Sequence, residues 1–276
     1  MGYIYCCCRR EHAKGTAANA MLKLALNGVY GDSNNKYSPF YDPQYTMSIT
    51  VNGQLYLCML AESLMALPGT HMVQINTDGL TMLVHKWQRQ AFVKTCIQWQ
   101  THTGLELEST DYSAMLIRDV NSYIAVGTEG KVKRIGAYAH VTPLEDPYTR
   151  EVGWHKNHSA LVVPKAAEAA MINGTDVSEF VMGYSDQFAF MLSAKVPRSS
   201  KLFWGDQQIQ NTSRYYVSTD GRSLKKFMPP LNGTETWREF AIEKGWNVTI
   251  CNDADDFDWS TVNWLFYIEE ARKLVI

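Results

Sequence analysis

The sequence lacks most of the features that identify common protein classes. None of its 276 residues belong to a run approaching the roughly 18 consecutive apolar residues of a membrane span. The start, MGYIYCCCRREHAK, has basic residues after its short apolar run, unlike a secretion signal. There is also no G-x-S-x-G, no P-loop and no dinucleotide fingerprint. We therefore expect no membrane partner and none of the enzyme classes that those motifs define.

Cysteine offers neither a disulfide framework nor a metal site. Of the six cysteines, three are adjacent near the start, and Cys58, Cys96 and Cys251 lie far apart without a CxxC or Cys/His ligand spacing. We interpret them as reduced thiols, which predicts a cytoplasmic protein. The 46% apolar and 12% aromatic content predicts a globular chain with one large core or two modest ones.

The net charge of −2 hides an uneven distribution. Residues 195–226 carry seven basic residues (Lys195, Arg198, Lys201, Arg214, Arg222, Lys225, Lys226) against two acidic ones, Asp206 and Asp220, a net of +5. Phe203, Trp204, Tyr215 and Tyr216 are interleaved with them. Rings and cations together suit bases and phosphates, although a charge cluster of this size can also be only a solvated surface.

The pattern along the chain predicts an α+β fold. The expected helices span 9–29, 42–66, 87–101 and 164–172, with a last one ending in YIEEARKLVI. The segment HMVQINTDGLTMLV predicts a β-hairpin with residues 76–79 at its tip, and 112–125 and 130–139 read as strands. We place a domain boundary near Glu151, followed by a mainly helical segment with a long polar stretch.

Three polar residues share one face of the first helix. Lys23, Asn27 and Tyr30 stand at i, i+4 and i+7, so an ammonium, an amide and a phenol face one place. This set suits a triphosphate held by the lysine, beside a pocket for sugar and base. A solvated helix face is the alternative interpretation.

Two further sets of residues are candidates for chemistry. Asp78 sits at the hairpin tip between apolar runs, where a divalent ion would offset the cost of burying its carboxylate; an ordinary turn explains the same residues. Lys131, Lys133 and Arg134 follow in GKVKRIGAY, and alternation along a strand would send the two lysines to one face. Phosphate contact and protection of a sheet edge by lysine are both consistent with them.

The order of these motifs resembles family B DNA polymerases. Lys23-Leu-Ala-Leu-Asn27-Gly28-Val-Tyr30-Gly31 is similar to the motif K-x3-N-S-x-Y-G, and Gln74-Ile-Asn76-Thr77-Asp78-Gly79 to the D-T-D-S hairpin. Gly130-Lys131-Val-Lys133-Arg134 resembles the later lysine motif. ITVNGQ, DVNSYIA, SRYYVSTDG, EKGW and YIEEARKL look like the bacteriophage branch, so the resemblance covers nearly the whole chain.

The resemblance implies a role for each matching residue in DNA replication. Lys23, Asn27, Tyr30 and Gly31 would bind the deoxynucleoside triphosphate, and Asp78 would be the catalytic carboxylate that holds Mg²⁺. Primer-template DNA would contact Lys131, Lys133 and Arg134, and further on the basic residues Arg214, Arg222, Lys225 and Lys226. The implied segments are the end of the fingers (1–36), the palm (37–150) and a DNA-binding thumb (151–276). The resemblance also implies the cytoplasm of the host cell, if the source is a phage.

The sequence departs from the family at two matching positions and also lacks several of its features. Gly28 replaces a serine, and Asn76 replaces the first carboxylate of the hairpin. No D-x-x-S-L-Y-P motif supplies the second carboxylate that two-metal transfer requires, and no exonuclease D-x-E motif is present. Met1 also falls inside the expected fingers. We therefore expect a split polymerase that needs a separate N-terminal chain, with a non-catalytic DNA-binding module as the alternative.

Overall fold

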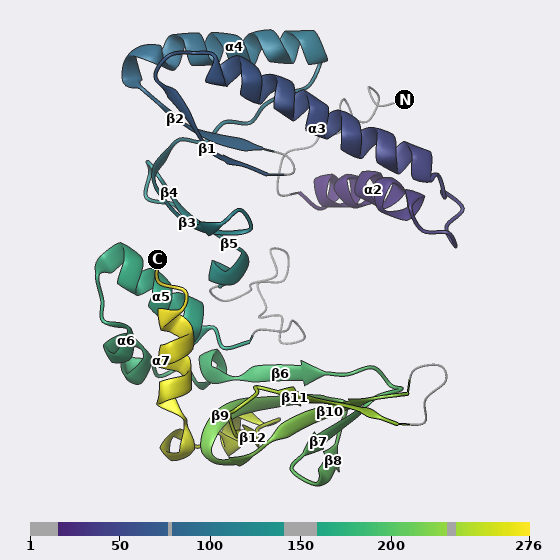
Figure 1. The fold of residues 1–276 in the computed structure, drawn as a ribbon, viewed down its shortest axis with the longest axis vertical. Coiled ribbons are helices and arrows are strands. Elements are labelled where there is room, and N and C mark those ends of the chain that lie inside the picture. Colours follow the sequence, from purple (N-terminus) through teal and green to yellow (C-terminus); the bar gives the residue numbers. More distant parts are fainter. Residues whose placement is uncertain (1–15, 77–78, 141–158, 231–235) are drawn as a thin grey trace. The chain divides into compact units, whose positions relative to one another are not determined.

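The computed structural model describes residues 16–76, 79–140, 159–230 and 236–276, and its fold is α+β (Figure 1). The predicted fold class is therefore confirmed. The chain divides into two compact units, Met1–Thr110 and Asp111–Ile276. This division reflects compactness alone, so the functional segments 1–36, 37–150 and 151–276 remain predictions.

The described residues of the first unit form three α-helices, one 3-10 turn and one two-stranded sheet. They are α2 (Ala17–Ser33), α3 (Pro43–Met65), β1 (Thr70–Ile75), β2 (Leu80–Val84), the turn Lys86–Gln88 and α4 (Arg89–Thr103). The predicted helices 42–66 and 87–101 and the paired strands of the hairpin are confirmed, as is the predicted helix 9–29 from Ala17 on; residues 9–15 lie outside the described residues. The start of α3 shows why the sequence could predict it: the Asp42 side chain accepts a hydrogen bond from the Tyr45 amide, and Pro43 occupies the first turn.

Hydrogen bonds at the end of α2 join it to α3. The Ser33 hydroxyl donates to the Tyr30 carbonyl at 2.6 Å and lies 2.6 Å from the Thr46 hydroxyl, while the Asp42 amide donates to the Ser33 carbonyl at 2.7 Å. Ser33 is buried, although most of α2 is exposed. The orientation of α2 is thus set by its last turn.

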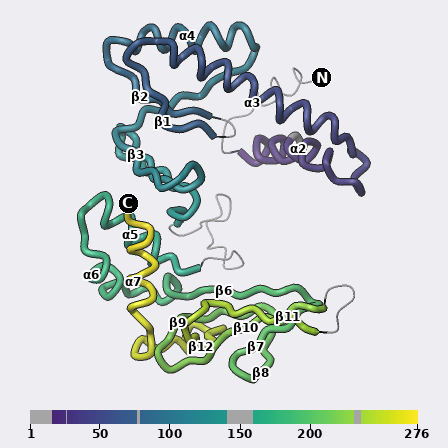
Figure 2. Tube along the Cα trace, viewed as in Figure 1, coloured from purple at the N-terminus to yellow at the C-terminus, as the bar shows by residue number. Residues whose placement is uncertain are grey.

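Within residues 111–140, 159–230 and 236–276, the second unit contains ten strands, three α-helices and several 3-10 turns. The sheet β3-β4-β5 comprises Tyr112–Asp119, Ser122–Gly127 and Val132–Ile135; the helices are α5 (Val162–Asn173), α6 (Val177–Gly183) and α7 (Trp264–Arg272). A sheet in the order β12-β9-β6 comprises Val248–Ile250, Thr212–Arg222 and Leu192–Lys195. Another in the order β11-β10-β7-β8 comprises Arg238–Ile242, Leu224–Met228, Lys201–Trp204 and Gln207–Ile209. Figure 2 traces the chain through them.

Aromatic packing forms the main core of this unit. The Phe190 ring is fully buried and meets Trp259, Trp264 and Tyr267 edge to face, at centroid distances of 5.2, 5.4 and 5.0 Å. The Tyr267 hydroxyl donates to the Phe190 carbonyl at 2.7 Å and accepts from the Val217 amide at 2.9 Å. Helix α7 is thereby fixed to strand β9.

The structure corrects two details of the sequence-based expectations. The segment 112–125 is not one strand, because a turn at Val120 and Asn121 separates β3 from β4. The segment after residue 150 is not mainly helical, because the residues that the structure describes there include seven strands, β6 to β12. Many residues at their outward positions are polar or charged, so the sequence of these half-buried strands resembled a polar loop.

Candidate functional site

Helix α2 carries the predicted nucleotide-binding residues on one face. Lys23, Asn27 and Tyr30 all lie within Ala17–Ser33, so the spacing that predicted a shared stripe applies to a real helix. Lys23, Asn27 and Gly31 are exposed, and Tyr30 is 40% exposed. The Tyr30 hydroxyl lies 3.1 Å from the Thr50 hydroxyl of α3, which holds one end of the stripe in place.

The glycine at the serine position of this motif has open space around it. A Cβ built on Gly28 meets no atom within 4 Å, and the same holds for Gly31. A serine side chain would therefore fit at residue 28. The absence of serine removes a hydroxyl from the helix face, and no steric clash at residue 28 requires a glycine there.

The hairpin that carries Asp78 is formed as predicted. Strand β1 pairs antiparallel with β2 up to Ile75 and Leu80, and the Asn76 amide donates to the Gly79 carbonyl at 2.9 Å. Thr77 and Asp78 lie outside the described residues. Among the described residues of this hairpin, the regular pairing of β1 with β2 is interrupted between Met72 and Gln74, where the register shifts by one residue.

The Asn76 side chain offers one test of whether this hairpin suits a cation. Its Oδ1 is buried and has no hydrogen-bond partner among the residues that the structure describes. An unpaired buried oxygen costs about 1–3 kcal/mol, and an amide oxygen is a ligand that hard cations accept. The amide oxygen of Asn76 therefore has the chemistry of a Mg²⁺ ligand. Within the four described ranges, no group of three or more His, Cys, Asp or Glu side chains is placed to hold a metal.

The three basic residues at strand β5 that were predicted to bind DNA differ in their contacts. Lys131 precedes the strand and Lys133 lies within it, and both are exposed. Arg134 is different because its Nε and Nη2 both donate to the Glu168 carboxylate, and its Nη1 donates to the Val132 carbonyl at 3.2 Å. Its guanidinium is therefore already occupied by a partner within the protein.

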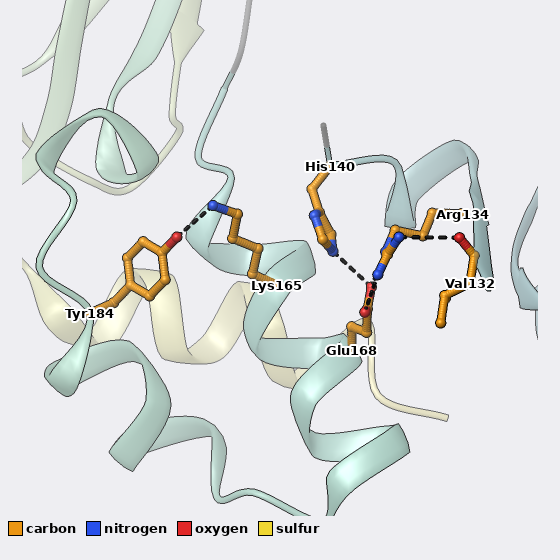
Figure 3. A network of polar contacts seen from close by, with 6 residues as sticks. All are labelled: Val132, Arg134, His140, Lys165, Glu168 and Tyr184. Carbon is orange, nitrogen blue, oxygen red and sulfur yellow. Dashed lines mark hydrogen bonds and ion pairs between the residues drawn. The ribbon is translucent and has the colours of Figure 1, made fainter. Parts of the chain in front are cut away.

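Glu168 is the centre of a polar network that the sequence interpretation missed (Figure 3). It lies on α5 and also bonds to His140 Nε2 at 2.7 Å; the two side chains are 15% and 7% exposed. Burial opposes ionisation of Glu168, but the hydrogen bonds from Arg134 and His140 outweigh it, so the pKa of Glu168 lies below its ordinary value. Burial lowers the pKa of His140, which is neutral at pH 7. No sequence motif could have identified this network, because Glu168 is 28 residues from His140 and 34 residues from Arg134 in the sequence.

The four basic residues predicted to bind DNA beyond β6 lie on two strands that belong to different sheets. Arg214 is half-buried within β9, whereas Lys225 and Lys226 lie on β10 in the other sheet. Lys225 forms an ion pair with Glu239 at 2.8 Å, and this hydrogen bond raises the pKa of Lys225. The guanidinium of Arg222 lies 4.9 Å from the centre of the Trp204 ring. A cation thus lies beside Trp204, whereas Tyr215 and Tyr216 are buried in the core, so the interleaving of cations and rings suggested by the sequence is only partly present at the surface.

No helix within the described ranges is long and apolar enough to cross a membrane. Comparison with protein-family models and with curated proteins finds no match. Among solved structures, the chain is similar to the family B DNA polymerase from the hyperthermophilic archaeon Pyrobaculum calidifontis, with a TM-score of 0.46 and 14% sequence identity. The match covers 99% of this chain and 35% of that one, so the chain spans about a third of the length of that polymerase.

Proposed function

We propose that this chain is the C-terminal part of a DNA-directed DNA polymerase that performs two-metal nucleotidyl transfer together with a separate N-terminal chain. The observation that carries the proposal is the stripe Lys23, Asn27 and Tyr30 on one face of α2, followed along the chain by a formed hairpin whose turn contains Asp78. The stripe supplies a point charge for a triphosphate, and the hairpin supplies a carboxylate for a cation.

Each residue has a defined role in this proposal. Lys23 binds the triphosphate, Asn27 and Tyr30 line the nascent base pair, and Lys131 and Lys133 contact the primer strand. Arg134 has no DNA contact here, because Glu168 holds its guanidinium. Mg²⁺, when bound near Asp78, supplies charge stabilisation for phosphoryl transfer.

The exposed apolar side chains of α3 support the need for a second chain. Met47, Leu55, Met59 and Met65 are 61, 57, 39 and 58% exposed, and α3 has only one charged residue, Glu62. Only three residues of this 23-residue helix are buried. Covering such a surface with an apolar partner is favourable by about 25 cal/mol per Å².

The decisive experiment is primer extension with Mg²⁺ and deoxynucleotides. It compares this chain alone with a mixture that contains an N-terminal family B fragment carrying the missing aspartate. Extension is expected only in the mixture and is lost on Asp78→Ala, while Asp255→Ala, an exposed carboxylate outside the site, retains it. A mixture that remains inactive, or extension by the chain alone, contradicts the proposal of a split active site.

A second variant tests the nucleotide site itself. Lys23→Ala removes a charged contact to phosphate, which is expected to lower kcat/KM for the deoxynucleotide about 10- to 150-fold. Lys36→Ala is the matched control, because Lys36 is exposed just beyond α2. Equal effects of the two variants would show that Lys23 contributes only general charge.

A non-catalytic DNA-binding module is the second candidate, favoured by the net positive charge of residues 195–226. It predicts duplex binding that weakens with salt at a log–log slope of about −0.9 per neutralised phosphate. Charge reversal at Arg222, Lys225 and Lys226 should flatten that slope, and Asp78→Ala should leave it unchanged. An unchanged slope in the charge-reversal variant would remove these residues from the contact.

A further inference from the structure

The four-stranded sheet β11-β10-β7-β8 has one inward and one outward face. Directly opposed residues of antiparallel strands point to the same side, so the pairs of Leu224 with Trp204 and with Ile242 define the inward face. Leu202 and Leu224 are fully buried there and belong to the main core. The intervening positions therefore form the other face of the sheet.

That outward face carries an aromatic pair. Phe203 of β7 and Phe227 of β10 stand on a diagonal of the register, and their rings meet edge to face with centroids 5.1 Å apart. Both are partly exposed, and neither belongs to the hydrophobic core formed by the described residues. Ring surface is thus left accessible on this sheet.

Lysines occupy the positions between these rings. Lys225 is directly opposite Phe203, and Lys201 is directly opposite Phe227. The ammonium of Lys201 also lies 4.8 Å from the centre of the Trp237 ring, which immediately precedes β11 and is 38% exposed. On this face, rings and ammonium groups thus alternate both along each strand and between the two strands.

The charge of this sheet differs in sign from that of the chain. On the outward face the register places Lys201 and Lys225 against one acidic residue, Glu239, which is directly opposite Phe227, a net of +1, while the whole chain has −2. The other two basic residues of these strands stand on the inward side, with Lys226 opposite Leu202 and Arg238 opposite Met228. Glu239 neutralises part of the charge through its ion pair with Lys225. Lys201 has no acidic residue in its own cross-strand pairs. The small net positive charge of this face suits a phosphate backbone.

We propose that the outward face of this sheet, defined by Phe203, Phe227, Lys201, Lys225 and Trp237, binds single-stranded nucleic acid by stacking bases on its rings. A base in a duplex is already stacked and paired, so a duplex could use only the lysines of this face. A single strand can use both rings and lysines. The proposal goes beyond the polymerase function, since it needs neither nucleotide nor catalytic carboxylate.

A purely structural role for the aromatic pair gives a different expectation. Diagonal aromatic pairs stabilise sheets, and lysines protect exposed strands, so the same residues could serve stability alone. In that case replacing the rings would lower stability without changing any affinity. Binding and unfolding must therefore be measured on the same variants.

The test is fluorescence anisotropy of the full chain with a labelled oligothymidylate about 16 nucleotides long, the upper end of the site size of small single-strand-binding domains. Oligouridylate and a duplex of equal length are the comparison probes. The assay contains no Mg²⁺ and no deoxynucleotide, so its outcome is independent of primer extension. Phe203→Ala and Phe227→Ala are each expected to weaken single-strand binding about 5- to 150-fold.

Matched variants separate stacking from bulk and charge. Phe227→Trp keeps a ring and is expected to retain binding, whereas Phe227→Leu keeps apolar volume and is expected to lose it. Lys201→Ala should reduce the salt slope by about 0.7, the value for one single-strand phosphate, while Lys244→Ala, an exposed lysine outside the sheet, should not.

Ring-dependent binding of either oligonucleotide supports the proposal, and the two probes decide between DNA and RNA. The proposal is overturned if folded Phe203→Leu and Phe227→Leu variants, with native near-ultraviolet circular dichroism, keep the parent Kd. It is also overturned if the parent chain binds only the duplex. An inactive primer-extension mixture with ring-dependent binding would instead refute the polymerase proposal alone.

Discussion

The Glu168 network gives a stability prediction whose magnitude follows from burial. Glu168→Gln removes the charge that accepts two hydrogen bonds from Arg134 and turns one carboxylate oxygen into an amide donor. Breaking a fully buried ion pair costs about 3–5 kcal/mol, and an exposed pair is worth about 0–1 kcal/mol. The Arg134 and Glu168 side chains are 27% and 15% exposed, so we expect a loss of about 2 kcal/mol in the free energy of unfolding.

Urea and thermal unfolding measure this loss through tryptophan fluorescence, because Trp204, Trp246, Trp259 and Trp264 pack against the core of the same unit. A loss of about 2 kcal/mol lowers Tm by about 4–8 °C for a unit of this size. Glu270→Gln is the matched control, since Glu270 pairs with Lys273 on the protein surface and its replacement should cost much less than that of Glu168.

The pH dependence of the same variant adds an independent check. The pKa of Glu168 is depressed in the folded chain, so its stabilisation is present above its ordinary value of 4.5 and is lost as the pH falls through the folded value. The difference between the parent chain and Glu168→Gln should therefore shrink in acid. Equal losses for Glu168→Gln and Glu270→Gln at neutral pH would refute the assignment of Glu168 as the centre of a stabilising network.

Three further predictions concern a histidine and three glycines. Burial lowers the pKa of His140 below 6.5, so the unfolded chain takes up its proton first and stability should fall as the pH drops below 6.5; His140→Gln should flatten the urea midpoint over that interval, and an unchanged slope would contradict this. Gly136 has φ +64° and a built Cβ would lie 1.9 Å from the Asn121 carbonyl oxygen, whereas Gly130 has φ +81° and open space. Gly136→Ala should thus cost several kcal/mol and Gly130→Ala only about 1 kcal/mol in urea unfolding, and equal costs would rule out the steric cause. Gly28→Ala should raise Tm, because it adds about 0.4–1 kcal/mol within a helix where the new Cβ meets nothing; a lower Tm would reveal an unseen contact.

Much of the first unit could be predicted from local sequence. The helix with Lys23, Asn27 and Tyr30 follows from a run of good helix formers, and the hairpin around Asp78 follows from two apolar runs separated by turn residues. The stripe on α2 needed only helical periodicity. Whether it binds a triphosphate stays a prediction, as does the metal role of Asp78.

The strands of the second unit could not be predicted as reliably. In β7 and β10, outward Lys201, Phe203 and Lys225 alternate with inward Leu202 and Leu224. Over four or five residues, such alternation differs little from a polar loop. Pairing with strands that are distant in the sequence decides whether such a segment forms a strand, and the local sequence does not identify the pairing partner.

The sequence by itself determined the helices, the hairpin and the set of residue types available for a phosphate and a cation. Only the tertiary structure decided which cations remain free, because that depends on contacts between residues far apart in the chain. Arg134 meets Glu168 across 34 residues, while Lys133 beside it remains exposed. It also decided which rings are left on a surface, because Phe203 and Leu202 are neighbours in sequence but lie on opposite faces of one sheet.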